Sequence, residues 1–309
     1  MEEPVLKVDR LSHRYSVQWA IRDISFELPR RGIYGLLGSN GAGKSTTMNI
    51  VSGVIKQTSG TVKIKGIDTR EDPVAAKRLI GFLPQKPPLY NDMTVDEYLT
   101  YCAKLRWVPA DKVASSVDEV LERCGIMHFR KRQIKNLSGG YQQRVGIAQA
   151  IVHKPELVIF DEPTNGLDPN QILEVRNLIK HIAEEQMVIL STHILTEVQA
   201  VCDDILMIEE GRLVFSGKVE DFDNYITPNT LVVSFVDAPS AETLQGIEGV
   251  RHVKELSPGR FRIGYADAQE VMDRLVEESA RCRWRMSELR VEKSSLDNIF
   301  AELSKKVKQ

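Results

Sequence analysis

A glycine-rich segment near the start of the chain has residues suited to holding phosphate groups. Residues 38–45 read GSNGAGKS and fit the pattern G-x-x-x-x-G-K-[ST]. In such a loop, glycines let backbone N–H groups turn toward phosphate oxygens, and a following helix adds its positive N-terminal end. The flanking residues predict this context, with an apolar strand at Ile33–Leu37 and a helix at Ser45–Ser52. We therefore predict a nucleoside triphosphate site.

Two side chains of this segment have predicted roles in the chemistry. Lys44 would reach the β- and γ-phosphates, and the hydroxyl of Ser45 would ligate Mg²⁺. The segment's predicted contacts to the nucleotide come from Gly38, Ser39, Asn40, Gly41, Ala42, Gly43, Lys44, Ser45 and Thr46.

Two carboxylates follow an apolar stretch in the middle of the chain. Leu157–Phe160 predicts a buried parallel strand, and Asp161 and Glu162 come directly after it. Ligands gather at the carboxyl ends of such strands. There Asp161 can bind Mg²⁺ through water, and Glu162 can polarise the water that attacks the γ-phosphate. By itself, the pair is also compatible with a solvated strand end.

Two further polar side chains follow predicted strands of the same sheet. His193 comes shortly after the apolar strand Met187–Leu190, where it could contact the γ-phosphate. Gln85 follows residues 80–84, and its amide could hydrogen-bond the attacking water or ligate the metal through its carbonyl oxygen. Taken singly, either residue is as compatible with an ordinary surface role as with a catalytic one.

The elements that position these residues follow from hydrophobic periodicity. Strand patterns dominate residues 5–66, helical spacing dominates about Thr94 to Ile151, and strands alternate with helices after Pro155. This alternation predicts an α/β fold with a parallel sheet and helices on its faces. Besides those above, the predicted strands of the first part are Leu6–Leu11, Ile21–Leu28 and Thr61–Ile67.

A change of composition near residues 227–230 predicts a boundary between residues 1–227 and a small domain at 228–309. The second part has the order βαββαβ, which describes a ferredoxin-like α+β unit. Its hairpin contains Ser257–Arg260, with Pro and Gly placed as in a type II turn. The predicted elements are strand 231–236, helix 240–246, strands 251–256 and 260–265, helix 267–280, strand 284–291 and a last helix 295–304.

Composition excludes several classes of protein. The chain of 309 residues has a net charge of −2, so no global field favours nucleic acid, and we expect no nucleic-acid partner. No stretch approaches the roughly 18 apolar residues that a membrane span needs, and no secretory signal is evident. Four well-separated cysteines predict neither a metal site nor a disulfide framework. A reducing cytosol is the expected compartment.

The motifs together resemble those of the ABC ATPases, over about residues 5–225. Leu137–Arg144, LSGGYQQR, is similar to the family's LSGGQ signature, with Tyr141 where Gln is commonest. The resemblance implies a P-loop NTPase core with an antiparallel β subdomain and a helical subdomain at about residues 87–150. Ser138, Gly139 and Gly140 would form a second anion site at a helix N-terminus.

The resemblance assigns further roles in the order that the family has them. Tyr15 would stack on adenine, Gln85 would sense the γ-phosphate, and Glu162 would be the general base. Asp168 would lie in the loop that links two ATP sites, and His193 would be the switch histidine. As implied by the family, two chains pair head to tail around ATP and Mg²⁺, as a homodimer or with a paralogous ATPase.

Three functional interpretations remain open at this stage. The first is an ATPase that drives integral membrane permease subunits, in the cytoplasm and peripheral on the inner face of the membrane. Within it, the C-terminal unit resembles those of exporter-type ATPases for drug-resistance, sodium-efflux or gliding-motility permeases, and import is the alternative. The second is a soluble ABC machine for translation, chromosomes or repair. The third is an idle regulator, which Lys44, Glu162 and His193 argue against.

Overall fold

The computed structural model describes residues 3–223 and 230–292. The chain divides into two compact units, residues 1–219 and 220–309. The predicted boundary at 227/228 and the predicted last helix at 295–304 lie outside the described residues. Among the described residues, no helix is long and apolar enough to span a bilayer.

An antiparallel sheet forms the first layer of unit 1, with the strand order β2-β1-β4-β5. The sequence predicted one strand at Thr61–Ile67, and this prediction is wrong. The chain reverses at Lys65 and Gly66, whose φ angles are 47° and 74°, so two short strands pair instead. The strands of this sheet are β1 (Leu6–Tyr15), β2 (Gln18–Leu28), β4 (Ser59–Ile64) and β5 (Ile67–Asp68).

A second, mostly parallel sheet has the order β10-β9-β3-β8-β7-β6 and confirms the α/β prediction. Only the edge pair β9–β10 runs antiparallel. The carboxyl ends of β3, β6, β7 and β8 therefore meet at one edge, where ligands of such sheets bind. The strands are β3 (Ile33–Leu37), β6 (Ile80–Leu83), β7 (Leu157–Asp161), β8 (Met187–Thr192), β9 (Asp204–Glu209) and β10 (Arg212–Lys218).

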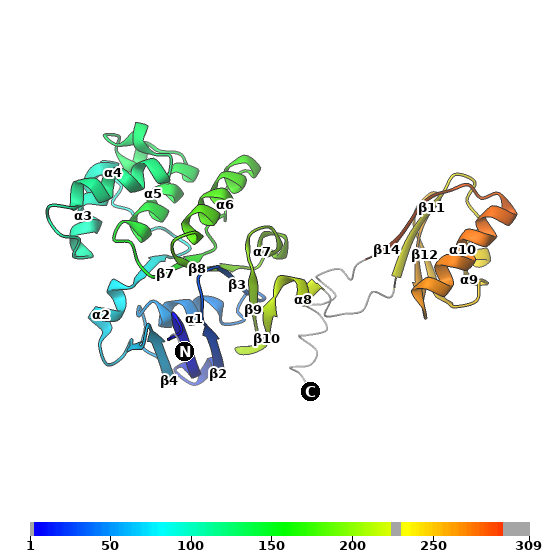
Figure 1. Cartoon of the computed structure of the whole chain (residues 1–309), viewed down its shortest axis with the longest axis horizontal. Coiled ribbons are helices and arrows are strands. Elements are labelled where there is room, and N and C mark those ends of the chain that lie inside the picture. Colours follow the sequence, from blue (N-terminus) through cyan, green and yellow to red (C-terminus); the bar gives the residue numbers. More distant parts are fainter. Residues whose placement is uncertain (1–2, 224–229, 293–309) are drawn as a thin grey trace. The chain divides into compact units, whose positions relative to one another are not determined.

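Local signals explain where several helices of unit 1 begin. Thr94 and Glu97 form a capping box at the start of α3, and Asp168 caps α6 ahead of a proline at its first position. In Figure 1, α3, α4 and α5 gather in one group beside the parallel sheet. The α-helices are α1 (Lys44–Val51), α2 (Pro73–Arg78), α3 (Val95–Leu105), α4 (Val113–Arg123), α5 (Gly139–Ile151), α6 (Pro169–Ala183) and α7 (Leu195–Val201). Two 3₁₀ turns occupy Met127–Phe129 and Ile134–Asn136.

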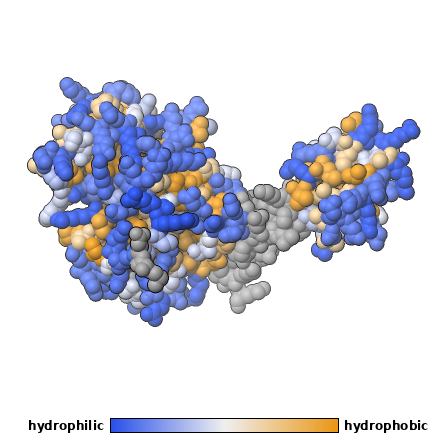
Figure 2. All heavy atoms as spheres, viewed as in Figure 1, coloured by the Kyte–Doolittle hydropathy of each residue, from blue (hydrophilic) through white to orange (hydrophobic). Residues whose placement is uncertain are grey.

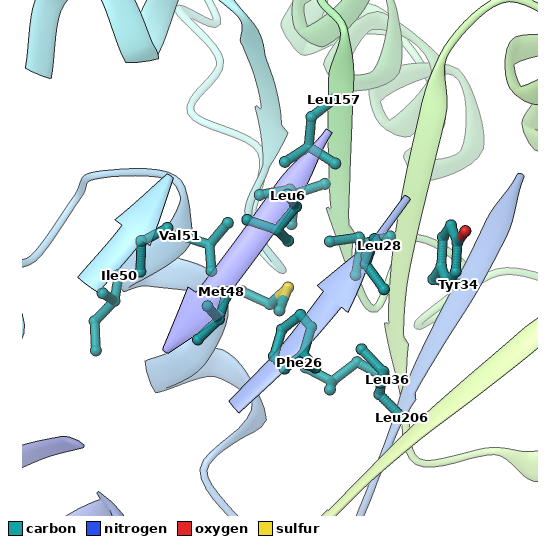
Figure 3. Packing of buried hydrophobic residues seen from close by; sticks show 14 of the residues in the cluster. Leu6, Phe26, Leu28, Tyr34, Leu36, Met48, Ile50, Val51, Leu157 and Leu206 are labelled. Carbon is teal, nitrogen blue, oxygen red and sulfur yellow. The ribbon is translucent and has the colours of Figure 1, made fainter. Parts of the chain in front are cut away.

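The core of unit 1 lies around α1, between the two sheets. Met48 and Val51 of this helix are buried among Leu6 and Phe26 of the antiparallel sheet and Leu157 of the parallel one (Figure 3). Each fully buried aliphatic or aromatic side chain contributes roughly 1.5–3 kcal/mol by leaving water. The helix that begins at the glycine-rich loop is thus held from both sides, which fixes the position of the loop.

The short helix α8 (Val219–Asp223) spans the boundary between the two units, and unit 2 contains the predicted βαββαβ order. Its antiparallel sheet has the strand order β12-β13-β11-β14, the ferredoxin-like arrangement. Side chains of both helices pack in one hydrophobic cluster with those of the sheet, Leu244 from α9 and Val271 and Leu275 from α10. The elements are β11 (Thr230–Phe235), α9 (Ala241–Gln245), β12 (Val250–Ser257), β13 (Arg260–Tyr265), α10 (Ala268–Cys282) and β14 (Met286–Glu292).

Candidate ATP-hydrolysing site

The glycine-rich loop connects β3 to α1, and at two of its glycines a Cβ would clash with neighbouring atoms. A Cβ on Gly38 would lie 2.1 Å from the carbonyl oxygen of Ile208, so the loop passes directly against β9. Gly43 has a φ of 109° and packs against Ile21 of β2, where a Cβ would lie 2.6 Å from a side-chain methyl. The loop is therefore pressed between both sheets, with its backbone shaped for an anion.

Lys44 is buried at the start of α1. Its Nζ donates hydrogen bonds to the carbonyl oxygens of Gly38 and Ser39, at 2.8 and 2.9 Å. Burial lowers the pKa of the ammonium, while the nearby carboxylates of Glu162 and Asp161 act in the opposite direction. The cation is thus held inside the loop, at the place where phosphate oxygens would bind.

The two predicted acids lie at the end of β7 and differ in environment. Asp161 is buried, which raises the pKa of its carboxyl, and the hydroxyl of Ser45 is close enough to lower that pKa in part. Glu162 has a φ of 50°, a conformation rare for residues other than glycine. Its N–H donates to the carbonyl oxygen of Ser191 at 2.9 Å, which holds the strained residue against β8.

Three side chains at this sheet edge contact the carboxylate of Glu162. His193 Nδ1 lies 2.9 Å from Oε1, and Gln85 Nε2 donates to Oε2 at 2.7 Å. Asn165 donates to Oε2 at 3.3 Å. Residues from after β6, β7 and β8 therefore converge on one carboxylate. The sequence singled out Gln85, Glu162 and His193 but assigned no role to the side chain of Asn165, whose only signal was its place before Asp168.

The segment LSGGYQQR forms the start of α5, with Ser138 as the residue before its first turn. Ser138 and Gly139 are exposed, and no heavy atom lies within 4 Å of the position that a Cβ on Gly139 would take. Gly140 instead packs against the side chain of Gln171 in α6. The Tyr141 ring stands edge-on to Phe129, with the ring centres 4.5 Å apart. The open N–H groups of a helix N-terminus suit an anion that approaches from outside.

Comparison with known proteins decides the family of this chain. A family model described as ABC transporter matches residues 21–165. The linearmycin resistance ATP-binding protein LnrL of Bacillus subtilis is 30% identical over 305 residues, covering 97% of this chain and 98% of that protein. This chain belongs to the ABC transporter ATP-binding proteins. The bacitracin transport ATP-binding protein BcrA of Bacillus licheniformis is 38% identical over 212 residues, covering 68% of each chain.

Solved structures agree with this family. The cbiO1 protein of Clostridium perfringens, part of the ABC transporter complex cbiONQ, matches with a TM-score of 0.66 and 31% identity, covering 72% of this chain and 92% of that one. The ATP-binding cassette MJ0796, solved as a dimer with ADP and Pi, shares the fold with a TM-score of 0.63, 24% identity, and coverage of 69% and 98%. This chain is accordingly an ATPase and the ATP-binding subunit of a transporter.

Two predicted nucleotide contacts of this ABC ATPase lie apart from the Glu162 cluster. Tyr15 is 52% exposed at the end of β1, where it pairs with Gln18 and stands edge-on to His13. Asp168 caps α6 by accepting from the N–H groups of Asn170 and Gln171, both at 3.0 Å. An exposed aromatic ring can stack on a base, and a capping aspartate fixes the loop in which it lies. Both roles in ATP binding stay predictions.

The sequence analysis did not single out one acidic residue that contacts the glycine-rich loop of this ABC ATPase. Glu209, at the end of β9, accepts from the N–H of Ser39 at 3.2 Å and from its hydroxyl at 2.8 Å. The carboxylate thereby holds the start of the phosphate loop. Its only sequence signal is the pair of acids, Glu209 and Glu210, that ends the apolar run of β9, a pattern that surface residues share.

The residues predicted to hold Mg²⁺ fit that ion by their chemistry. Ser45, Gln85 and Asp161 offer a hydroxyl, an amide oxygen and a carboxylate, and Mg²⁺ prefers oxygen ligands with one or two protein carboxylates. The described residues include no cluster of three or more His, Cys, Asp or Glu side chains suited to a metal. A site of this kind does not need one, because phosphate oxygens and water complete the ligand set of Mg²⁺.

Proposed function

We propose that this ATPase drives a separate integral membrane permease from the cytoplasmic face of the membrane, and that the permease exports its substrate. The observation that supports ATP turnover is the convergence of Gln85 and His193 on the carboxylate of Glu162. The similar protein cbiO1 is part of an ABC transporter complex, which supports a separate partner chain for this ATPase as well. That chain must bind a surface of this one.

In the proposed reaction, Glu162 polarises the attacking water and takes up its proton. His193 and Gln85 hold the two oxygens of this carboxylate, so its orientation is set before ATP binds. Lys44 leaves the carbonyl oxygens of its own loop and binds the β- and γ-phosphates. Ser45, Gln85 and Asp161 would hold Mg²⁺, which would supply positive charge to offset that of the phosphates.

The second anion site supports a head-to-tail pair of chains around two ATP molecules. Ser138 lies at the exposed start of α5, on a different element from Lys44 and Glu162. A partner copy, or a paralogous ATPase, can therefore present its own γ-phosphate to these N–H groups. Hydrolysis removes the phosphate that bridges the chains, and the pair opens, which is a switch held by a γ-phosphate.

A groove of about 380 Å³ in unit 1 is suited to a segment of the permease. Four of its apolar side chains are largely exposed, with Val54 at 60%, Val74 at 56%, Leu105 at 57% and Trp107 at 68%. In Figure 2, hydrophobic residues gather on the surface near α2, which contributes to this groove. Its remaining lining residues are Ser52, Gly53, Lys77, Arg78, Phe82 and Arg106.

The charge of the groove indicates what kind of segment binds there. Its lining includes three cations and no acidic residue, and Arg78 stacks over the Trp107 ring at 4.1 Å. A short amphipathic helix with apolar and acidic side chains would match both properties. The groove adjoins β6 through Phe82, and Gln85 follows that strand, so movement of the bound helix can reach the hydrolytic cluster.

Export is supported by the length of the similarity to LnrL, whose name assigns it to linearmycin resistance. That similarity covers 97% of this chain and therefore includes unit 2, whereas the similarity to the bacitracin transport protein BcrA covers 68% of this chain. We therefore assign this ATPase to resistance-type export. The permease determines the substrate.

Capture from native membranes tests the proposal. A tagged Glu162→Gln variant is incubated with detergent-solubilised membranes and ATP, and bound proteins are identified by mass spectrometry. We expect a membrane protein with several spans in about stoichiometric amount, and its loss from Glu162→Gln/Trp107→Asp. The control is Glu162→Gln/Lys63→Glu, which alters an exposed residue of β4 away from the groove. Recovery of soluble proteins alone would overturn the proposal.

A further inference from the structure

One buried acid outside the hydrolytic cluster lies where a link between its parts is needed. Glu197, in the first turn of α7, is only 3% exposed. Acidic residues are almost never this buried unless they are paired. The mechanism described above gives it no role, so its partners must account for its position.

Glu197 joins two segments that each carry a residue of the hydrolytic site. Thr164 donates to its Oε1 at 2.6 Å, and Thr192 donates to its Oε2 at 2.9 Å. Thr164 lies two residues after Glu162, and Thr192 directly precedes His193. One carboxylate therefore bridges the backbone next to Glu162 and the backbone next to His193.

A third segment reaches the same carboxylate. Arg176 of α6 places Nη2 3.7 Å from Oε1 of Glu197, and α6 starts at the cap that Asp168 provides. Glu197 thus contacts the loop after β7, the end of β8 and the helix that follows the Asp168 loop. Hydrogen bonds to a buried carboxylate are among the stronger ones in proteins, because the charge is poorly screened.

The bridge is separate from the direct contact between Glu162 and His193. Thr192 Oγ1 also accepts from the N–H of Ile194 at 3.0 Å, so the turn that presents His193 is tied to the same hydroxyl. A rotation of either segment would distort or break one hydrogen bond of Glu197. The Glu197 carboxylate is therefore placed to keep the two segments in a fixed relative position during ATP hydrolysis.

We propose that Glu197 is a positioning residue that couples the segment carrying Glu162 and Asp168 to the segment carrying His193. The inference rests on the proposed roles of Glu162 and His193. Misplacing a catalytic group by about 1 Å can cost roughly 100-fold in rate. Loss of the bridge should accordingly lower kcat for ATP hydrolysis while leaving ATP affinity in place, because Lys44 and the phosphate loop are not part of it.

The test uses the threonines, because removing a buried acid could unfold the chain. Thr164→Val and Thr192→Val each keep the side-chain shape and remove one hydroxyl. The corresponding Thr→Ser variants keep the hydroxyl. We expect each valine variant to lower kcat by roughly 10- to 100-fold with the ATP dissociation constant changed less than about twofold. The serine variants should recover most of the rate. The double valine variant should lose little more than the worse single one, since either change breaks the same bridge.

The outcomes separate this inference from the proposed function. Valine variants that change only the melting temperature, with kcat normalised to ATP-binding sites unchanged, would show a merely structural role for Glu197. Fully multiplicative losses in the double variant would also contradict a shared bridge. Failure of the Glu162 assignment would appear elsewhere, as wild-type turnover by Glu162→Gln. Glu197→Gln, studied alongside, should reproduce the valine losses if it folds.

Discussion

Replacing Glu162 by glutamine is the sharpest perturbation that the site offers. Glutamine keeps the shape and one oxygen, so one of the contacts at 2.9 Å to His193 or 2.7 Å to Gln85 can persist. The amide cannot take up a proton from water. Loss of a general base typically costs about 10²- to 10⁴-fold, which corresponds to about 2.7–5.5 kcal/mol of activation free energy. The phosphate loop stays intact, so binding should survive.

The affinity for ATP should stay the same or increase after this change. The carboxylate of Glu162 lies close enough to Lys44 to act on its pKa, so it also repels incoming phosphates. We expect an unchanged or lower dissociation constant in a titration with fluorescent ATP, together with a kcat for phosphate release lowered at least 100-fold. Glu122→Gln, an exposed acid of α4, is the matched control. A Glu162→Gln rate within about threefold of the wild type would refute the general-base assignment.

Three further predictions concern other parts of the chain. Lys44→Ala should raise the dissociation constant for ATP at least tenfold, because the buried cation for the phosphates is lost; unchanged affinity in the fluorescent titration would count against it. Ser138→Arg should abolish the ATP-dependent dimer of Glu162→Gln on a sizing column without weakening ATP binding by the monomer, and a persisting dimer would contradict the two-chain site. Burial lowers the pKa of His153 to about 4 from 6.5. As the pH falls, His153 therefore takes up its proton in the unfolded chain at a higher pH than in the folded one. The free energy of unfolding should fall by up to about 3 kcal/mol as the pH drops from 6.5 toward 4. Denaturant unfolding should show a smaller loss of stability in His153→Gln than in the wild type. Equal losses in the wild type and the variant would exclude His153 as the cause.

Much of the fold is readable from the sequence because its periodic signals are local. The apolar run at Leu157–Phe160 and the glycines of residues 38–45 predict a buried strand and a phosphate loop from neighbouring residues alone. The split of Thr61–Ile67 into two strands was missed, because the turn at Lys65 and Gly66 sits inside a β-branched pattern. Only the pairing of β4 with β5 reveals it.

The cluster around Glu162 was predictable by residue type but not by geometry. Strand ends at one sheet edge place Gln85, Glu162 and His193 near one another, and the resemblance to ABC ATPases names them. The φ of 50° at Glu162 has no local signal, because it depends on the contact with Ser191 of the next strand. Glu197 was missed for the same reason, since a single acid in an ordinary helix becomes a bridge only through tertiary contacts.

Site-specific photo-crosslinking from the groove tests the central claim most directly. A photoreactive amino acid replaces Val74, which is 56% exposed in the groove, or Leu173, which is 58% exposed on α6, in the otherwise intact chain. After irradiation of native cells, we predict that position 74 yields an adduct with a membrane protein of several spans and that position 173 does not. Adducts of position 74 with soluble proteins only, under conditions where the chain is active as an ATPase, would contradict a role in driving a permease.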